Sequence, residues 1–150
     1  MSDMAPDQLS LEDRFKILDL YARQAHAVDG GDGEAWAATF TEDARFVAPT
    51  YKLTAHGRGE LSAFAVESNQ GARQRGEQLR HVVTAIAISP KEDSQVDVRS
   101  YLTIIATSET GSRVDRSVIM VDVLRRAGDG WLVASREALR DPWPPLEGDG

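Results

Sequence analysis

Residues 11–46 read LEDRFKILDLYARQAHAVDGGDGEAWAATFTEDARF, and this stretch says most about the fold. Apolar side chains recur in it at intervals of four and three positions, at Leu11, Phe15, Leu18, Ala22 and Ala25. This spacing predicts a helix whose apolar face packs toward the core. The next position on that face is an acid, Asp29. We expect Asp29 either to end the helix as a turn residue before two glycines or to lie in a cavity with a proton to move.

The composition limits the classes of protein to which the chain can belong. With 150 residues and 41% hydrophobic content, the chain is expected to form one domain around one core. Its net charge of −7 and its lack of basic runs argue against nucleic acids and anionic membranes as partners. It contains no cysteine, which excludes disulfides, thiolate catalysis and cysteine-ligated metals. Its acidic start resembles no secretion signal, and no apolar run is long enough to span a membrane, so we expect a cytoplasmic protein.

Three helices are predicted in the first half of the chain. Ser10, with Asp13 three positions later, is typical of a helix N-cap, and the first helix is expected to reach about residue 28. A glycine-rich turn should follow it. The next predicted elements are a short helix at 34–39, a short strand at 45–47, a third helix at 62–68 and a polar, mobile loop at 71–78.

From residue 79 onward the pattern changes to long strands. Short polar connections separate four strand-like segments, at residues 79–88, 95–107, 113–126 and 130–140. Helices followed by an antiparallel meander predict an α+β domain whose helices cover one face of a curved sheet. We place this domain at residues 10–141, between a flexible N-terminus at 1–9 and an extended, proline-containing tail at 142–150.

His81 is the strongest candidate for catalysis among the three histidines. On its strand it shares a face with Ala85 and Ala87, whose small side chains could leave a hollow beside the imidazole. An isolated histidine on a strand can equally be a hydrogen-bonded structural residue. His26 lies just off the helical apolar face and His56 lies in a loop beside glycine, so we expect both to be exposed.

Asp29 and His81 together indicate a more specific chemistry than either residue alone. A carboxylate bonded to one imidazole nitrogen fixes the tautomer and makes the other nitrogen a better base, which can remove a proton without metal or cofactor. The sequence has no set of metal ligands and no nucleotide-binding glycine motif, so we expect neither a metal nor a cofactor. The candidates for the pocket wall are Tyr51, Tyr101, Met120 and Arg136, and the aromatic residues expected in the core are Trp36, Phe40, Phe46 and Phe64.

The motifs along the chain resemble those of a known family, the SnoaL-like branch of the nuclear-transport-factor-2-like superfamily. They are LDLYARQAHAVDGGDGEAWAATFTEDARF, HGRGELSAF, LRHVVTAIAI and DGWLVASREALRD, and the resemblance covers residues 11–141. It implies a cone of helices around a strongly bent antiparallel sheet that encloses an apolar pocket. In scytalone dehydratase and gamma-hexachlorocyclohexane dehydrochlorinase, which are similar, an aspartate at the end of the first helix orients a strand histidine that abstracts a proton. Asp29 and His81 match these positions, but Val28 stands where the dehydratase has a pocket tyrosine.

The resemblance implies a cofactor-independent lyase or isomerase acting on a small apolar molecule, such as an aromatic or polycyclic one. His81 would be the general base, Asp29 its orienting carboxylate, and Tyr51, Tyr101 or Arg136 would donate hydrogen bonds to developing negative charge. Elimination, double-bond migration and cyclisation begin with the same proton abstraction, so the sequence does not separate them. The alternative is a non-catalytic ligand-binding or scaffold protein, such as the small subunit of a ring-hydroxylating oxygenase. The family also implies a homodimer or homotrimer built through the sheet.

Overall fold

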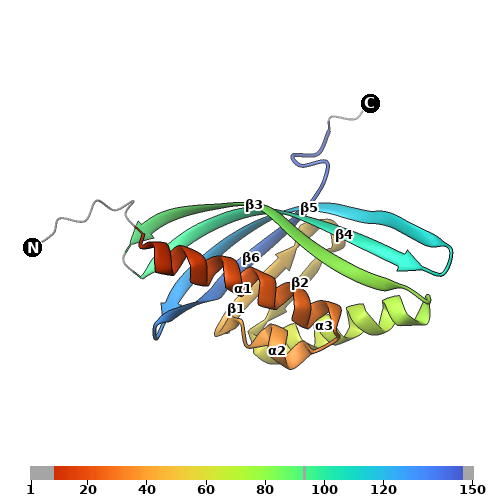
Figure 1. The fold of residues 1–150 in the computed structure, drawn as a ribbon, viewed down its shortest axis with the longest axis horizontal. Coiled ribbons are helices and arrows are strands. Elements are labelled where there is room, and N and C mark those ends of the chain that lie inside the picture. Colours follow the sequence, from red (N-terminus) through yellow and green to blue (C-terminus); the bar gives the residue numbers. More distant parts are fainter. Residues whose placement is uncertain (1–8, 93, 147–150) are drawn as a thin grey trace, which may run out of the picture.

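Three helices lie on one side of a six-stranded sheet in the computed structural model, which describes residues 9–92 and 94–146 (Figure 1). The elements in chain order are α1 (Leu11–Asp29), α2 (Gly33–Ala37), β1 (Phe40–Ala48), the short helical turn η1 (Pro49–Tyr51), β2 (Leu53–His56), α3 (Gly57–Gln74), β3 (Gln78–Glu92), β4 (Gln95–Ser108), β5 (Gly111–Ala127) and β6 (Gly130–Arg140). This arrangement confirms the predicted α+β fold, with helices covering one face of a curved sheet.

The strand order is β2-β1-β6-β5-β4-β3. The last four strands form the predicted antiparallel meander, and each of its first three strands is longer than the sequence indicated. β1 lies parallel to β6, with Phe46 opposite Arg136, so the first strand pairs with the last. Neither this parallel pair nor the short strand β2 was predicted, and the four residues of β2 are too few to show a clear alternation pattern.

Helix α1 turns a different face to the core than its apolar spacing predicted. Leu11, Phe15 and Leu18 are 85%, 72% and 46% exposed. The buried positions are Ile17, Leu20, Tyr21, Gln24, Val28 and Asp29, which also follow the helical period. The two faces differ because Tyr21 and Gln24 find hydrogen-bond partners inside the domain, so polar side chains occupy core positions that hydrophobicity alone would not select.

Several boundaries also differ from those predicted. α3 spans Gly57–Gln74, so half of the segment expected as a mobile loop at 71–78 is helical, because Ala72 in its last turn is buried in an apolar cluster with Leu79 and Ile104. On β3, Ala85 has a φ of 52°, and the register with β4 shifts there. This bulge reverses the alternation, so Ala85 and Ala87 are exposed and do not share a face with His81 as expected.

The ends of the chain fall mostly outside the described residues. Of the predicted flexible segment 1–9, only Leu9 is described, and it packs against the core. Of the predicted tail at 142–150, residues 142–146 are described, and they have no helix or strand. Among the described residues, no helix has both the length and the apolar character needed to cross a membrane.

The start of α1 is tied to the turn between β5 and β6 through Asp13. Ser10 accepts a hydrogen bond from the backbone N–H of Asp13, which confirms the predicted N-cap. Both carboxylate oxygens of Asp13 accept from the guanidinium of Arg126 at 3.0 Å, and Trp131 Nε1 donates to the same carboxylate at 3.0 Å. The hydrogen bonds from Arg126 lower the pKa of Asp13 to about 2, against the opposing effect of burial.

An Asp13→Asn variant should therefore lose stability in a pH-dependent way. Because the pKa of Asp13 is lower in the folded than in the unfolded chain, its carboxylate stabilises the fold at neutral pH and loses this effect as the pH falls toward 2. We expect the variant to lose about 2 kcal/mol at pH 7, and the difference from the wild type to shrink below about pH 4. Urea unfolding of both proteins across this pH range measures the difference in the free energy of unfolding. A difference that does not change with pH would contradict the lowered pKa of Asp13.

Candidate functional site

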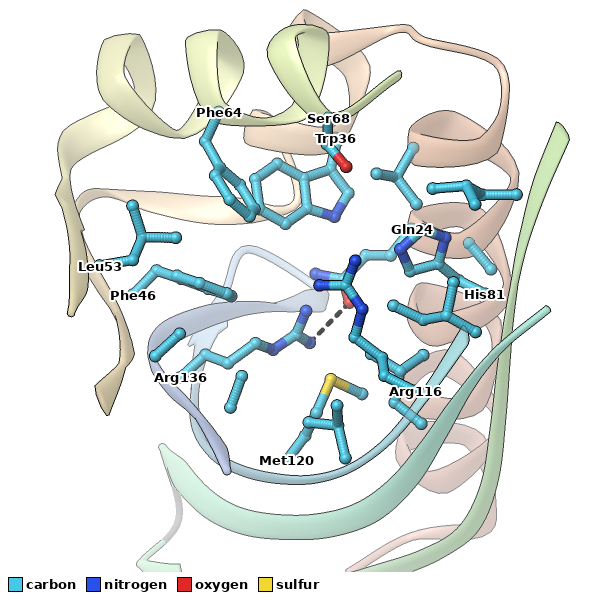
Figure 2. Close-up of a pocket in the computed structure, with 18 of the residues that line it drawn as sticks. Gln24, Trp36, Phe46, Leu53, Phe64, Ser68, His81, Arg116, Met120 and Arg136 are labelled. Atoms are coloured by element: carbon cyan, nitrogen blue, oxygen red, sulfur yellow. Dashed lines mark hydrogen bonds between the residues drawn. The ribbon is translucent and has the colours of Figure 1, made fainter. Parts of the chain in front are cut away.

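A cavity of about 470 Å³ lies between the helices and the inner face of the sheet, within the size range of small-molecule sites (Figure 2). Much of its wall is apolar, with contributions from Val28 of α1, Trp36 of α2, Phe64 of α3 and Leu102 of β4. The polar side chains of the wall include Gln24, His81, Arg116 and Arg136. A ligand that fills this space would therefore be largely apolar, with a few polar groups at defined positions.

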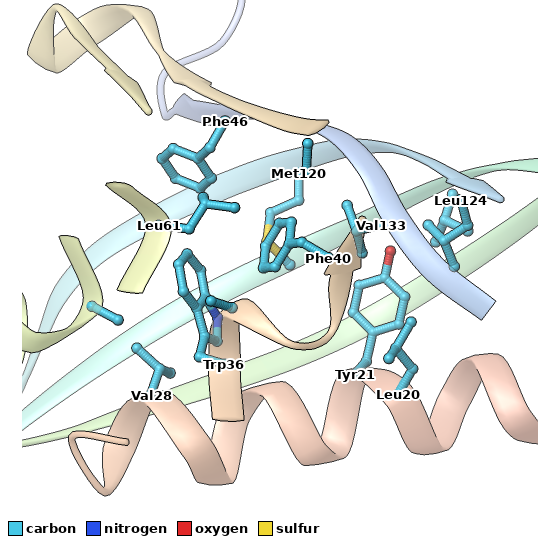
Figure 3. Packing of buried hydrophobic residues seen from close by; sticks show 14 of the residues in the cluster. Leu20, Tyr21, Val28, Trp36, Phe40, Phe46, Leu61, Met120, Leu124 and Val133 are labelled. Atoms are coloured by element: carbon cyan, nitrogen blue, oxygen red, sulfur yellow. The ribbon is translucent and has the colours of Figure 1, made fainter. Parts of the chain in front are cut away.

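Aromatic residues join the core to this cavity (Figure 3). The ring centroid of Trp36 lies 4.7 Å from that of Phe40 and 6.2 Å from that of Phe46, in edge-on arrangements. Phe46 in turn lies 5.2 Å from Phe64. All four were expected in the core; Trp36, Phe40 and Phe46 are buried, whereas Phe64 is partly buried and packs against the cluster. Gly33 allows α2 to approach α3, because a Cβ there would lie 2.5 Å from the carbonyl oxygen of Ser62.

Asp29 and His81 meet at the wall of the cavity. Asp29 is the last residue of α1 and is 8% exposed, and His81 lies near the start of β3. The Nδ1 atom of the His81 ring is 2.6 Å from Asp29 Oδ1. The backbone N–H of His81 also donates to the two carboxylate oxygens, at 3.1 and 3.2 Å. One carboxylate thus holds both the strand and the ring of this histidine.

The end of α1 is fixed in turn by two side-chain amides. Gln78 Nε2 donates to the backbone carbonyl of Asp29 at 3.1 Å, and Asn69 Nδ2 donates to the same oxygen at 3.4 Å. With Nδ1–H donating to Asp29, the second ring nitrogen of His81, Nε2, remains without its proton in the neutral ring. Because His81 lines the cavity, this arrangement can act as a base toward a ligand there.

A buried hydrogen-bond network lies beside the dyad. Arg136 Nε and Nη2 donate to the two carboxylate oxygens of Asp122 at 2.9 Å, and Nη2 also donates to Gln24 Oε1 at 2.8 Å. The hydroxyl of Tyr21 donates to Asp122 Oδ2. Gln24 Nε2 donates to the hydroxyl of Thr39 at 2.8 Å. These bonds satisfy polar groups that are costly to bury unpaired.

The network also controls ionisation inside the domain. Burial raises the pKa of the Tyr21 hydroxyl, and the adjacent Asp122 carboxylate raises it further, so Tyr21 stays protonated and donates. Burial acts to lower the pKa of Arg136, but the charge and hydrogen bonds of Asp122 outweigh it and raise this pKa. Arg136 therefore presents a permanent positive charge at the cavity wall.

The structure brings most, but not all, of the predicted pocket residues to the cavity. Tyr51, Met120 and Arg136 line it; Met120 and Arg136 are buried, and Tyr51 is 42% exposed. Tyr101 does not reach the cavity and is 57% exposed. The reason is the alternation of β4, on which the neighbours of Tyr101, Ser100 and Leu102, face inward.

Several polar residues of the site were missed by sequence reasoning, among them Glu67 and Ser68 of α3, which line the cavity. Gln24 and Arg116 line the cavity, and Asp122 pairs with Arg136 behind it. Asp122 could have been recognised from the sequence, because it interrupts an alternating set of apolar positions on β5, between Met120 and Leu124. His26 and His56 are both exposed, as expected, but His56 is the last residue of β2 and does not lie in a loop. Within the described part of the chain, no group of three or more acidic or histidine side chains is placed to hold a metal ion.

Comparison with known proteins agrees with this architecture. The chain matches a SnoaL-like domain over residues 9–137. It is similar to the structure of Aln2 from a Streptomyces species, with 30% identity, a TM-score of 0.78, and coverage of 89% of this chain and 93% of that chain. It is also similar to a protein from Catenulispora acidiphila solved in complex with S-DNPA, with 34% identity, a TM-score of 0.75, and coverage of 88% and 96%.

A further similar structure is that of ActVI-ORFA from Streptomyces coelicolor, with 28% identity, a TM-score of 0.78, and coverage of 88% of this chain and 97% of that chain. Among curated proteins, none matches the chain. The domain match covers most of the sequence, and the fold, with its helices on one face of a curved sheet, is the one that this match implies. The chain therefore belongs to the SnoaL-like family of the nuclear-transport-factor-2-like superfamily.

Proposed function

We propose that this protein is a cofactor-independent lyase or isomerase that removes a proton from a carbon atom of a small, largely apolar substrate. His81 is the general base in this proposal, and Asp29 is the carboxylate that orients it. The observation that carries the proposal is the 2.6 Å contact between His81 Nδ1 and Asp29 Oδ1 at the wall of an apolar cavity. An imidazole held in this way has one nitrogen available to accept a proton.

The proposed reaction begins with transfer of a proton from the substrate carbon to His81 Nε2. The electron pair of the broken C–H bond moves into the substrate, as an enolate when a carbonyl group is adjacent. Asp29 stabilises the imidazolium that forms. His81 can then return the proton at a second carbon, which is isomerisation, or deliver it to a leaving oxygen, which is elimination. Arg136 is positioned to stabilise negative charge that develops on a substrate oxygen.

The family relationship supports this reading at a coarser level. The SnoaL-like family includes cofactor-free isomerases and cyclases, and the Catenulispora acidiphila relative forms a complex with S-DNPA. Association into a homodimer or homotrimer through the sheet stays a prediction.

The test is enzyme-dependent exchange of a carbon-bound proton with deuterium oxide. β-Tetralone is a suitable probe, since it is a small fused-ring ketone with an acidic proton next to its carbonyl group. We expect the wild-type protein to accelerate deuterium incorporation above the buffer rate, and His81→Ala to lower that acceleration by about 10²–10⁴-fold. Mass spectrometry or proton NMR follows the exchange. His26→Ala, at an exposed histidine, is the matched control and should exchange like the wild type.

The opposite result would favour the non-catalytic alternative. If the His81→Ala variant exchanges the probe as fast as the wild type, His81 is not the base. If wild-type protein binds β-tetralone in the cavity, as seen by quenching of Trp36 fluorescence, yet exchanges no proton, ligand binding alone is the better description. Comparison of binding and exchange in one preparation thus separates the two functions.

A further inference from the structure

The cavity contains a guanidinium group, that of Arg116, which the proposed proton abstraction does not use. Arg116 lies on β5, and its side chain is 32% exposed. Figure 2 shows the guanidinium groups of Arg116 and Arg136 pointing toward the same central part of the cavity, beside the ring of His81. Two cationic groups that face one largely apolar space need a reason, because like charges repel more strongly there than in water.

The sheet register explains how Arg116 reaches this place. His81 of β3 lies opposite Ile104 of β4, and Ile104 lies opposite Arg116 of β5. The register shifts just before Arg116, since Val114 is the partner of Ile105, and Asp115 is the extra residue of a β-bulge. Arg116 faces inward by alternation with Val118 and Met120, which also line the cavity, and the bulge turns Val114, which is 63% exposed, off this face. His81 and Arg116 thus stand two strands apart, about 10 Å at the backbone.

Both guanidinium groups have unused donors. The hydrogen bonds of Arg136 involve Nε and Nη2, and among the described residues Nη1 has no hydrogen-bond partner. Arg116 uses Nε to bond Asp115 at 2.9 Å, and within the same part of the chain its Nη1 and Nη2 atoms also have none. A guanidinium carries five N–H donors, so each group keeps terminal N–H bonds to offer to an acceptor in the cavity.

The local balance of charge favours an anion as that acceptor. Arg116 belongs to a chain of ion pairs in which Glu77 pairs with Arg75 and Arg113, and Asp115 pairs with Arg113 and Arg116. Three guanidinium groups therefore share two carboxylates. Glu67 of α3 also lines the cavity, but among the described residues it forms no ion pair with Arg116 or Arg136. Arg140 adds a fourth positive group, because Arg116 and Arg140 lie over the ring of Tyr51, at 5.4 and 5.7 Å from its centroid. This concentration of positive charge occurs in a chain whose net charge is −7.

We propose that the ligand of this cavity carries a carboxylate on an apolar ring system, and that the Nη1 and Nη2 atoms of Arg116 bind it, while Nη1 of Arg136 faces the rest of the ligand. This inference rests on the proposed function only where it identifies the ligand as the substrate. The ring system of that substrate would extend from the carboxylate, over Ile104, toward His81. Asp115 is a positioning residue that holds Arg116. Burial acts to raise the pKa of Asp115, but the hydrogen bond and charge of Arg116 keep it below its ordinary value, so the pair remains ionised.

Binding measurements with a charged and a neutral probe test this inference. β-Naphthylacetate and β-naphthylacetamide have nearly the same shape and differ in charge. By isothermal titration calorimetry, we expect the wild-type protein to bind the acid at least about tenfold more tightly than the amide. Arg116→Gln should abolish this preference by weakening the acid alone. Arg113→Gln is the matched control, because Arg113 lies on the same strand and also pairs with Asp115 but does not line the cavity. This variant should keep the preference for the acid.

Two outcomes would overturn the inference. One is equal affinity of the wild-type protein for the acid and the amide. The other is an equal loss of preference in Arg113→Gln and Arg116→Gln, which would indicate a long-range effect of charge rather than a contact. The His81→Ala variant should keep the preference, because binding does not require the base. A failed deuterium exchange with preserved acid binding would therefore refute the proposed proton abstraction and leave the carboxylate site intact.

Discussion

An Asp29→Asn variant is expected to lose about 10³–10⁴-fold in the rate of enzyme-dependent deuterium exchange while remaining folded. Asparagine has nearly the shape of aspartate, and its oxygen can still accept the backbone N–H of His81, which now bonds the carboxylate at 3.1 and 3.2 Å. Its amide group, however, donates toward Nδ1 of the ring. This favours the tautomer with the proton on Nε2, which leaves no basic nitrogen for the substrate.

Asp32→Asn is the matched control for this variant. Asp32 is exposed and caps α2 by accepting the backbone N–H of Ala35 at 3.0 Å, and asparagine caps helices equally well. The same chemical change three residues away should therefore leave exchange unaltered. An Asp29→Asn protein that exchanges the probe within a few-fold of the wild-type rate, with an unchanged unfolding transition, would show that Asp29 does not orient the base.

The second large effect concerns stability, and it is expected for Asp122→Asn. Asp122 is fully buried and accepts two hydrogen bonds from Arg136, which is itself 5% exposed. Removing the negative charge leaves the guanidinium buried without its counter-charge, and it also removes the preferred acceptor of the Tyr21 hydroxyl. Breaking a buried ion pair from one side costs about 3–5 kcal/mol, so we expect a loss of that size in the free energy of unfolding.

Urea unfolding of the wild-type and variant proteins measures this loss. Asp19→Asn supplies the comparison, because Asp19 forms an exposed ion pair with Arg23 at 2.9 Å, with side chains 55% and 61% exposed. Such surface pairs contribute about 0.3–0.5 kcal/mol. If Asp122→Asn lowered the free energy of unfolding no more than Asp19→Asn does, the buried pair would not be part of what holds β5, β6 and α1 together.

The long strands and the order of elements were predictable because strand alternation and turn composition are local properties of the sequence. The helical face of α1 was not, because two faces satisfy the same period and the buried one contains Tyr21 and Gln24. Their burial depends on partners in β5 and β6, far along the chain. Periodicity locates a helix reliably, but it does not show which face gains distant hydrogen bonds.

The candidate site was also predictable only in part. The resemblance of local motifs identified Asp29 and His81, and the structure brings them into contact. The pocket wall was less predictable, since Tyr101 faces outward by alternation and Arg116, which alternates inward with Val118, is a charged residue that hydrophobicity alone would not place there. The bulge at Asp115 turns Val114 off this inward face. The bulge in β3 similarly moves Ala85 and Ala87 off the face that His81 occupies. Bulges reverse side-chain direction without a clear sequence mark, so residues beyond them are misplaced by pattern reasoning.

The most direct test of the central claim is the protonation pattern of the His81 ring, observed by heteronuclear NMR of the imidazole nitrogens in a protein whose rings are neutral. The exposed His26 and His56 serve as internal references. We predict that Nδ1 of His81 carries the proton and Nε2 does not in the wild type, and that the Asp29→Asn variant shows the reverse. A wild-type spectrum with the proton on Nε2 of His81 would contradict the account, because the nitrogen proposed as the base would already be occupied.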